Sequence, residues 1–251
     1  MILIKNIKIF NDNLVWIIYK NKKCIIIDPG LAKPIIQKLE KKRIIPIYIF
    51  ITHMHFDHIH GISKLINHYP NIKIFTPKKI KNIHKKHQKI IKKSKKIFIF
   101  NKLFYIFFTP GHTTHDLSYY FDQYLFCGDI LFSGGCGNTK DGCSKNLYKS
   151  LKKIQKFPKK TVFFNSHEYT INNLNFFQKI YKKDQFIQDY LNFLQKKSKN
   201  IINYSSLENE KKINLFFRIN EKKIKQMINY WYCSETKIEY FCNLRKIKDQ
   251  Y

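Results

Sequence analysis

Residues 52–58 read THMHFDH, so three histidines and an aspartate lie within seven residues. The apolar stretch IIPIYIFI, residues 44–51, stands directly before them and has the length and composition of a buried strand. Imidazole and carboxylate groups are common ligands of transition metals. The pattern therefore predicts a metal site at the end of this strand, provided that other parts of the chain supply further ligands.

Further metal-capable side chains follow other strand-like runs. His112 comes after LFYIFFTP, Asp129 after YLFC and His167 after TVFFNS. Ligands in α/β sheets gather at the carboxyl ends of strands, so we expect these side chains to converge. Five imidazoles and two carboxylates are too many for one tetrahedral ion, which predicts two ions of the Zn, Fe or Mn type. The predicted ligands are His53, His55, Asp57, His58, His112, Asp129 and His167.

Composition indicates a globular protein with reduced thiols. The chain has 251 residues, 44% of them hydrophobic, and a formal net charge of +30. Only three of its 47 basic residues are arginine, the residue preferred for phosphate and base recognition, so we interpret the lysines as solvated surface rather than a nucleic-acid interface. The six cysteines are widely spaced, and neither a signal peptide nor a membrane span is predicted. We therefore expect a cytoplasmic protein.

The order of the elements predicts two domains. Short strand-like runs alternate with helical segments at 33–42, 62–69 and 144–158, where Ser144 is the expected N-cap and Pro158 the stop. Helical spacing dominates from about residue 172, for example over 174–197. We predict an α/β domain over residues 1–170 and a helical domain over 171–251.

Some histidines are expected to have no part in the site. His68 lies in a predicted helix and is expected to be structural, whereas His84 and His87 lie in a lysine-rich stretch and are expected to be solvated. His60 and His115, although close to the motifs, are expected to be non-ligands. Asp28 ends a strand and is the predicted partner of a ligand histidine.

THMHFDH resembles the T-H-x-H-x-D-H signature of the metallo-β-lactamase fold, an αββα sandwich. By this resemblance His53, His55 and His112 hold a first metal ion, and Asp57, His58 and His167 hold a second. Asp129 bridges the two ions, which we expect to be zinc, with iron or manganese as alternatives. Asp57 also orients the metal-bound hydroxide that attacks the substrate. The cysteines near the site lack a histidine to activate them and are interpreted as structural.

Other stretches resemble glyoxalase II, the hydroxyacylglutathione hydrolase. They are DNLVW, IIDPG, FCGDILFSGGCG, HEYT with INN after it, and the terminal LRKIKDQY. The resemblance implies a metal-dependent thioester hydrolase that converts S-D-lactoylglutathione to D-lactate and glutathione in methylglyoxal detoxification. Tyr169, Arg245 and Lys248 match its glutathione-binding positions, and a cationic fork suits the two carboxylates of glutathione.

The stretch after GGCG departs from the family pattern. Asn138, Thr139, Lys140 and Cys143 stand where a basic residue, two aromatic or apolar residues and then E-G-T are usual, although Lys140 restores a charge nearby. Two alternatives therefore stay open: a metal-dependent nuclease, motivated by the basic chain, and a decayed metal-binding homologue. Persulfide dioxygenases share part of the motif but not the expected C-terminal domain. The expected partner is a small glutathione thioester, without membrane or nucleic acid, and the expected assembly is a monomer.

Overall fold

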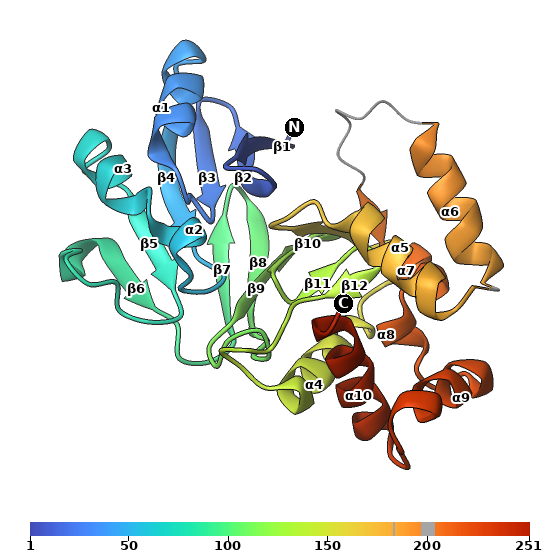
Figure 1. The fold of residues 1–251 in the computed structure, drawn as a ribbon. Coiled ribbons are helices and arrows are strands. Elements are labelled where there is room, and N and C mark those ends of the chain that lie inside the picture. The colour runs from blue at the N-terminus through green and yellow to red at the C-terminus, as the bar shows by residue number, and fades with distance from the viewer. Residues whose placement is uncertain (183, 197–203) are drawn as a thin grey trace. The chain divides into compact units, whose positions relative to one another are not determined.

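The computed structural model describes residues 1–182, 184–196 and 204–251 (Figure 1). The chain contains two compact units. The first unit comprises Met1–Phe108, His115–Asp122 and Phe126–Gly128, and the second comprises Thr109–Thr114, Gln123–Leu125 and Asp129–Tyr251.

The first unit contains a six-stranded sheet in the order β1-β2-β3-β4-β5-β6. The pairs β1–β2 and β2–β3 are antiparallel, and the pairs from β3 to β6 are parallel. Because β3 and β4 are parallel, their carboxyl ends share one edge, which brings Asp28 and the loop after β4 together. The strands are β1 (Leu3–Ile9), β2 (Asn13–Lys20), β3 (Lys23–Ile27), β4 (Ile45–Phe50), β5 (Lys73–Thr76) and β6 (Gln88–Ile90). The helices are α1 (Ala32–Lys41), α2 (Phe56–Ile59), α3 (Ile62–His68) and the 3-10 turn η1 (Lys85–His87).

Alternation along β4 explains how this sheet is covered on both faces. Ile49 belongs to a buried cluster that includes Ile35 of α1 and Leu65 of α3, whose apolar sides pack on this face (Figure 1). Phe50 points to the opposite face and stacks on Tyr119, with ring centroids 4.5 Å apart. The run IIPIYIFI is therefore apolar throughout because both of its faces are buried.

The second sheet has the order β14-β13-β10-β9-β8-β7. Inside the first unit, β7, β8 and β9 pair antiparallel, and the Tyr119 hydroxyl donates a hydrogen bond of 2.7 Å to the Ile51 carbonyl. The strands are β7 (Lys95–Ile99), β8 (Lys102–Phe108), β9 (Leu117–Phe121), β10 (Tyr124–Gly128), β13 (Val162–Asn165) and β14 (Ser205–Ser206).

The second unit is mainly helical. Its short hairpin joins β11 (Leu131–Phe132) to β12 (Gly135–Cys136). Asp184 caps α6 by accepting the Ile187 amide at 3.1 Å, and Thr236 with Glu239 forms a capping box for α10. The helices are α4 (Ser144–Ile154), α5 (Thr170–Ile180), α6 (Gln185–Gln195), α7 (Leu207–Ile213), α8 (Leu215–Arg218), α9 (Lys222–Trp231) and α10 (Lys237–Asp249).

The helix predictions hold with corrected ends. The helical spacing over 174–197 corresponds to α5 and α6, and residues 183 and 197 of that stretch lie outside the described residues. Ser144 is not an N-cap but the first residue of α4, with Cys143 before it as the cap, and α4 ends at Ile154 rather than running on to Pro158. No helix in the described ranges is long and apolar enough to cross a bilayer.

Candidate metal centre

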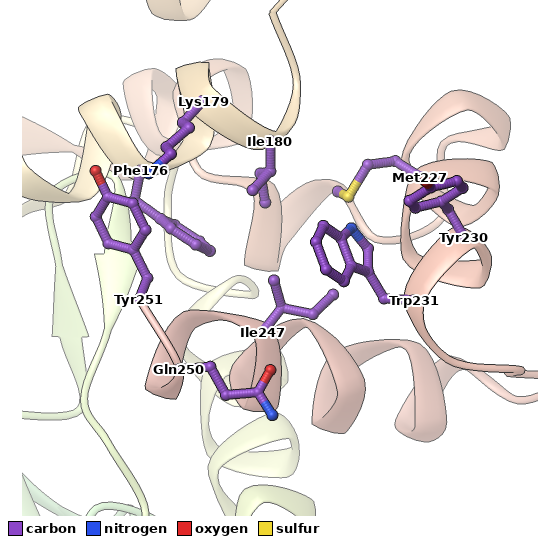
Figure 2. Close-up of a pocket in the computed structure, with 9 residues that line it drawn as sticks. All are labelled: Phe176, Lys179, Ile180, Met227, Tyr230, Trp231, Ile247, Gln250 and Tyr251. Atoms are coloured by element: carbon purple, nitrogen blue, oxygen red, sulfur yellow. The ribbon is translucent and has the colours of Figure 1, made fainter.

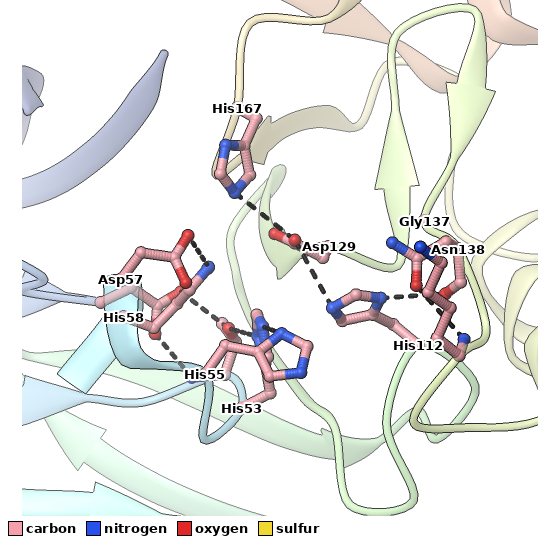
Figure 3. A network of polar contacts seen from close by, with 12 residues as sticks. His53, His55, Asp57, His58, His112, Asp129, Gly137, Asn138 and His167 are labelled. Atoms are coloured by element: carbon pink, nitrogen blue, oxygen red, sulfur yellow. Dashed lines mark hydrogen bonds and ion pairs between the residues drawn. The ribbon is translucent and has the colours of Figure 1, made fainter. Parts of the chain in front are cut away.

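The loop after β4 and the short helix α2 together place four of the predicted ligands within the first unit. His53 and His58 are each only 1% exposed, and their rings lie 3.9 Å apart between centroids. His53 Nε2 lies 3.0 Å from His55 Nδ1 (Figure 3). Two nitrogens bound to one tetrahedral zinc, each at 2.0–2.1 Å, would lie about 3.3 Å apart. The spacing of these two imidazoles therefore fits two ligands of one ion.

Asp28 orients the ring of His58. Its Oδ2 lies 3.1 Å from His58 Nδ1, and both side chains are buried. Thr52 fixes the carboxylate by donating its amide to Oδ1 at 2.8 Å and its hydroxyl to Oδ2 at 2.7 Å. A carboxylate on Nδ1 holds the proton there and leaves the Nε2 lone pair for a metal. The predicted contact between Asp28 and one of the candidate ligand histidines is confirmed, and that histidine is His58.

Asn13 is a site residue for which the sequence motif assigned no role. It begins β2, is 7% exposed, and donates its side-chain amide to Asp57 Oδ2 at 2.6 Å. The Asp57 side chain is 32% exposed and lies 3.5 Å from His58 Nε2. Asn13 thus fixes one carboxylate oxygen of a side chain that stays accessible to solvent. The stretch DNLVW carried the signal, since a polar pair precedes a buried strand there.

The second unit brings together His112, Asp129 and His167. Asp129 Oδ2 lies 3.6 Å from His112 Nε2 and 3.5 Å from His167 Nε2 (Figure 3). All three residues are buried, with exposed fractions of 3%, 8% and 6%. These separations exceed normal hydrogen-bond lengths but suit ligands arranged around ions. One carboxylate oxygen placed between two imidazoles is the arrangement expected of a bridging ligand.

The backbone of Asn138 orients His112. The Asn138 carbonyl lies 2.9 Å from His112 Nδ1, so that nitrogen carries the proton and donates it. Nε2, which faces Asp129, then keeps its lone pair for a metal. Both oriented histidines, His58 and His112, are therefore in the tautomer that a metal site needs.

The donor set fits divalent transition metals. Each of the seven predicted ligands belongs to a group of three His or Asp side chains that could hold an ion. Among the described residues, neither His60 nor His115 belongs to such a group. Mixed imidazole and carboxylate donors suit zinc, iron or manganese, so these groups are candidates for binding a divalent metal.

The other histidines mostly have local roles. His68 pairs with Glu40 at 2.9 Å, and His84 accepts the Lys86 amide at the start of η1. The prediction that His87 is solvated is wrong. It is 5% exposed, and its Nδ1 lies 3.0 Å from the Ile72 carbonyl, because η1 turns the ring inward against β5.

The predicted substrate residues differ in exposure. Tyr169 stacks on His167 with centroids 4.9 Å apart and ring planes at 7°, and Lys140 is exposed. Arg245 is 4% exposed, and its donors reach Cys136 and Asp249. Lys248 donates to Asn173, and burial together with the Arg245 charge lowers the pKa of Lys248 to about 7.

A separate cavity of about 510 Å³ lies among helices of the second unit (Figure 2). Phe176 of α5, Trp231 of α9 and Ile247 of α10 form its apolar walls, and Lys179 is the charged residue in its lining. Histidine, cysteine, aspartate and glutamate are missing from the described residues that line it. The groups capable of metal chemistry therefore lie at the strand ends and not in this cavity.

Comparison with known families matches almost the whole chain. The model of the metallo-beta-lactamase superfamily matches residues 10–167, and the model of the hydroxyacylglutathione hydrolase C-terminus matches residues 168–251. The first range contains all seven predicted ligands, and the second contains Tyr169, Arg245 and Lys248.

Two of the similar proteins carry the same name. The chain is 42% identical over 254 residues to the hydroxyacylglutathione hydrolase of Buchnera aphidicola subsp. Acyrthosiphon pisum, covering 98% of each chain. It is 36% identical over 255 residues to that of Citrobacter koseri, covering 99% of each.

Solved structures share the fold at low identity. The BLEG-1 B3 metallo-beta-lactamase has a TM-score of 0.64 at 21% identity, covering 86% of this chain and 99% of its own. ETHE1 from Myxococcus xanthus has a TM-score of 0.64 at 18% identity, covering 97% and 98%. These matches confirm the predicted fold class, a metallo-β-lactamase fold followed by a helical C-terminal domain.

Proposed function

The chain belongs to the hydroxyacylglutathione hydrolase family of the metallo-beta-lactamase superfamily, and from this premise we propose that it hydrolyses S-(2-hydroxyacyl)glutathione thioesters. The favoured substrate is S-D-lactoylglutathione, whose products are D-lactate and glutathione in the detoxification of methylglyoxal. The observation that carries the proposal is a full set of metal-ligand side chains followed by the C-terminal region of this family.

Two divalent ions are the proposed cofactors, zinc in the first place and iron or manganese as alternatives. His53, His55 and His112 would hold the first ion, Asp57, His58 and His167 the second, and Asp129 both. When bound, such ions would polarise the thioester carbonyl and lower the pKa of water to about 7. The Asp129 oxygen lying 3.6 and 3.5 Å from two imidazoles supports the bridging role.

Asp57 is the proposed catalytic orienting group. Asn13 fixes its Oδ2, and the carboxylate is more exposed than that of Asp129, at 32% against 10% of the side chain. It can therefore accept a hydrogen bond from an attacking water that enters from solvent. The leaving group is a thiolate whose conjugate acid has a pKa of about 8.5, so its departure needs little help from a general acid.

Tyr169, Lys248 and Lys140 are the proposed contacts of the glutathione moiety. Tyr169 stacks on His167 and so lies directly beside a proposed metal ligand. A bound carboxylate would favour the ammonium form of Lys248, whose pKa burial lowers to about 7. Arg245, predicted from the motif as a further contact, has a different set of partners, which are taken up below.

We further propose a cytoplasmic monomer that acts on this small molecule without nucleic acid or membrane as a partner. The six free cysteines support a reducing compartment. The nuclease and decayed-homologue alternatives are not favoured, because relatives that are 36–42% identical over nearly the full chain are hydroxyacylglutathione hydrolases.

The decisive measurement is the loss of thioester absorbance with S-D-lactoylglutathione before and after chelation. We expect turnover that chelation abolishes and that one of Zn²⁺, Fe²⁺ or Mn²⁺ restores. His53→Ala and Asp129→Ala should lose it as well, whereas His60→Ala should retain most of it. Absence of turnover from wild-type protein shown to hold two metal ions would refute the proposal.

A further inference from the structure

The hairpin of residues 131–138, here called the glycine hairpin, links two sets of contacts inside the second unit. It contains β11, β12 and three glycines, and Leu131 pairs with Cys136 across it. One side faces two proposed metal ligands. The other side is held by side chains from the C-terminal helices.

On the ligand side the backbone of the glycine hairpin contacts His112 and Asp129. A methyl group added at Gly137 would lie 2.0 Å from the Asp129 carbonyl oxygen and 3.2 Å from His112 Nδ1. The next residue, Asn138, accepts the His112 Nδ1 hydrogen bond at 2.9 Å. A shift of this backbone by a few tenths of an ångström would therefore move or release the ring of one ligand and the main chain of another.

On the helix side two polar side chains, Glu210 and Asn214, hold the turn of the hairpin. Glu210 of α7 accepts the Ser133 hydroxyl at 3.0 Å and the Gly134 amide at 2.9 Å. Asn214, after α7, donates to the Gly135 carbonyl at 3.0 Å. These bonds fix the tip of the hairpin and involve none of residues 136–138, here called the outgoing segment.

Arg245 of α10 holds the outgoing segment, residues 136–138. Its Nη1 donates to the Cys136 carbonyl at 2.9 Å, with the Gly137 carbonyl at 3.4 Å. Asp249, one turn later, accepts from Nε at 3.1 Å and pairs with Nη2 at 2.8 Å. The guanidinium is therefore fixed on both sides, and its buried charge is compensated.

We propose that Arg245 is a positioning residue for the metal centre. Through the carbonyls of Cys136 and Gly137 it sets the place of the Asn138 carbonyl, and through that carbonyl it sets the orientation of His112. The inference deepens the proposed function, since the ion concerned is the one that His112 and Asp129 would hold. A residue that only contacts substrate would not affect metal binding, whereas Arg245 in this role would.

The test is the zinc affinity of full-length protein, measured by competition with a chromophoric chelator and without substrate. Arg245→Met removes the guanidinium but keeps an unbranched chain, and we expect at least one zinc dissociation constant to rise about tenfold, the lower end of the effect of removing an outer partner of a ligand. Arg245→Lys keeps the charge and one donor, so its zinc dissociation constant should lie between those of Arg245→Met and wild type. If Arg245→Met does not fold, the zinc affinity of Arg245→Lys tests the inference in its place.

Arg218→Met is the matched control. Arg218 is also a paired arginine of the C-terminal helices, with a side chain 9% exposed against 5% for Arg245, and it binds Asp184 and Glu221 instead of the glycine hairpin. This variant should lose stability and keep its zinc affinity within about twofold, because removing it leaves no partner of a ligand unpaired.

Two results would overturn the inference. Unchanged zinc affinity in Arg245→Met together with a raised KM would make Arg245 a substrate contact only. An equal loss of zinc affinity in Arg218→Met would make the effect one of general stability. Failure of the proposed thioesterase activity is a separate outcome, because the zinc measurement uses no thioester.

Discussion

Asp28 shows how one side chain can decide the protonation of a ligand. It follows β3 with a positive φ of 53°, a conformation that aspartate and asparagine tolerate better than most residues. Its Oδ2 faces His58 Nδ1, while the Thr52 amide and hydroxyl occupy its oxygens. The carboxylate has only acceptors, so the imidazole proton must sit on Nδ1.

Asp28→Asn should therefore reduce metal affinity without disturbing the backbone. Oδ1 of asparagine can still accept the Thr52 amide, which turns the NH₂ group toward His58 and drives the imidazole proton to Nε2. We expect metal affinity to fall about 10–100-fold, measured by chelator competition. Glu40→Gln is the control, because it alters the exposed carboxylate partner of His68. Equal effects of the two substitutions would contradict the role of Asp28.

Residue spacing predicted the candidate ligands that the structure groups together, but not the groups that orient them. THMHFDH is local, and a turn after a buried strand places its side chains together whatever the rest of the chain does. Asn13 and the Asn138 carbonyl lie 44 and 26 positions away from their partners, and a backbone carbonyl has no residue type to detect. The prediction that His87 is solvated failed for a related reason. The burial of its ring follows from tertiary packing and not from its lysine-rich neighbours in the sequence.

At the scale of elements, strands with a continuous apolar run were predictable, and β1 was not. β3 and β4 are almost continuously apolar, whereas β1 reads LIKNIKI, and its lysines and asparagine hide the strand signal. The two-residue strands β11 and β12 are too short for any periodicity. Their glycines mark the hairpin instead, because the helices and ligands approach its backbone closely.

Glu210 offers a test of how α7 holds this hairpin. The carboxylate is fully buried and accepts from Ser133, Ser205, Gly134 and Asn214. Glu210→Gln would turn an NH₂ group toward these donors, which should lower the free energy of unfolding by about 1–3 kcal/mol. Urea unfolding measures it, and Glu208→Gln on the exposed side of α7 is the control.

The sign of the pH dependence follows from the direction of the pKa. Burial raises the pKa of Glu210 above its usual value. The unfolded state then releases its proton first, so wild type loses stability relative to Glu210→Gln as the pH rises through the folded pKa. The gap between the two proteins should be larger at pH 5 than at pH 8. If the difference in the free energy of unfolding grew with pH instead, the fold would stabilise the ionised form of Glu210 more than the protonated form.

For the whole molecule, composition was the weakest guide and family-specific motifs were the strongest. A net charge of +30 pointed toward nucleic acid, yet nearly all of that charge is lysine, a residue that solvates surfaces in any protein class. HEYT and LRKIKDQY indicated the family, and the matching C-terminal family model and the relatives confirm it. The charge must nevertheless act on any anion that approaches, and S-D-lactoylglutathione carries two carboxylates.

Salt should therefore slow capture of the substrate and leave chemistry unchanged. The Debye length falls from about 30 Å at 0.01 M ionic strength to about 8 Å at 0.15 M. Because electrostatic steering raises association rates 10-fold or more, we expect kcat/KM for the anionic thioester to fall about tenfold over this range, with kcat constant. An uncharged lactoyl thioester is the matched control and should show little change. If salt slows both substrates equally, it acts on the fold or on the metal centre, and the lysine surface does not steer.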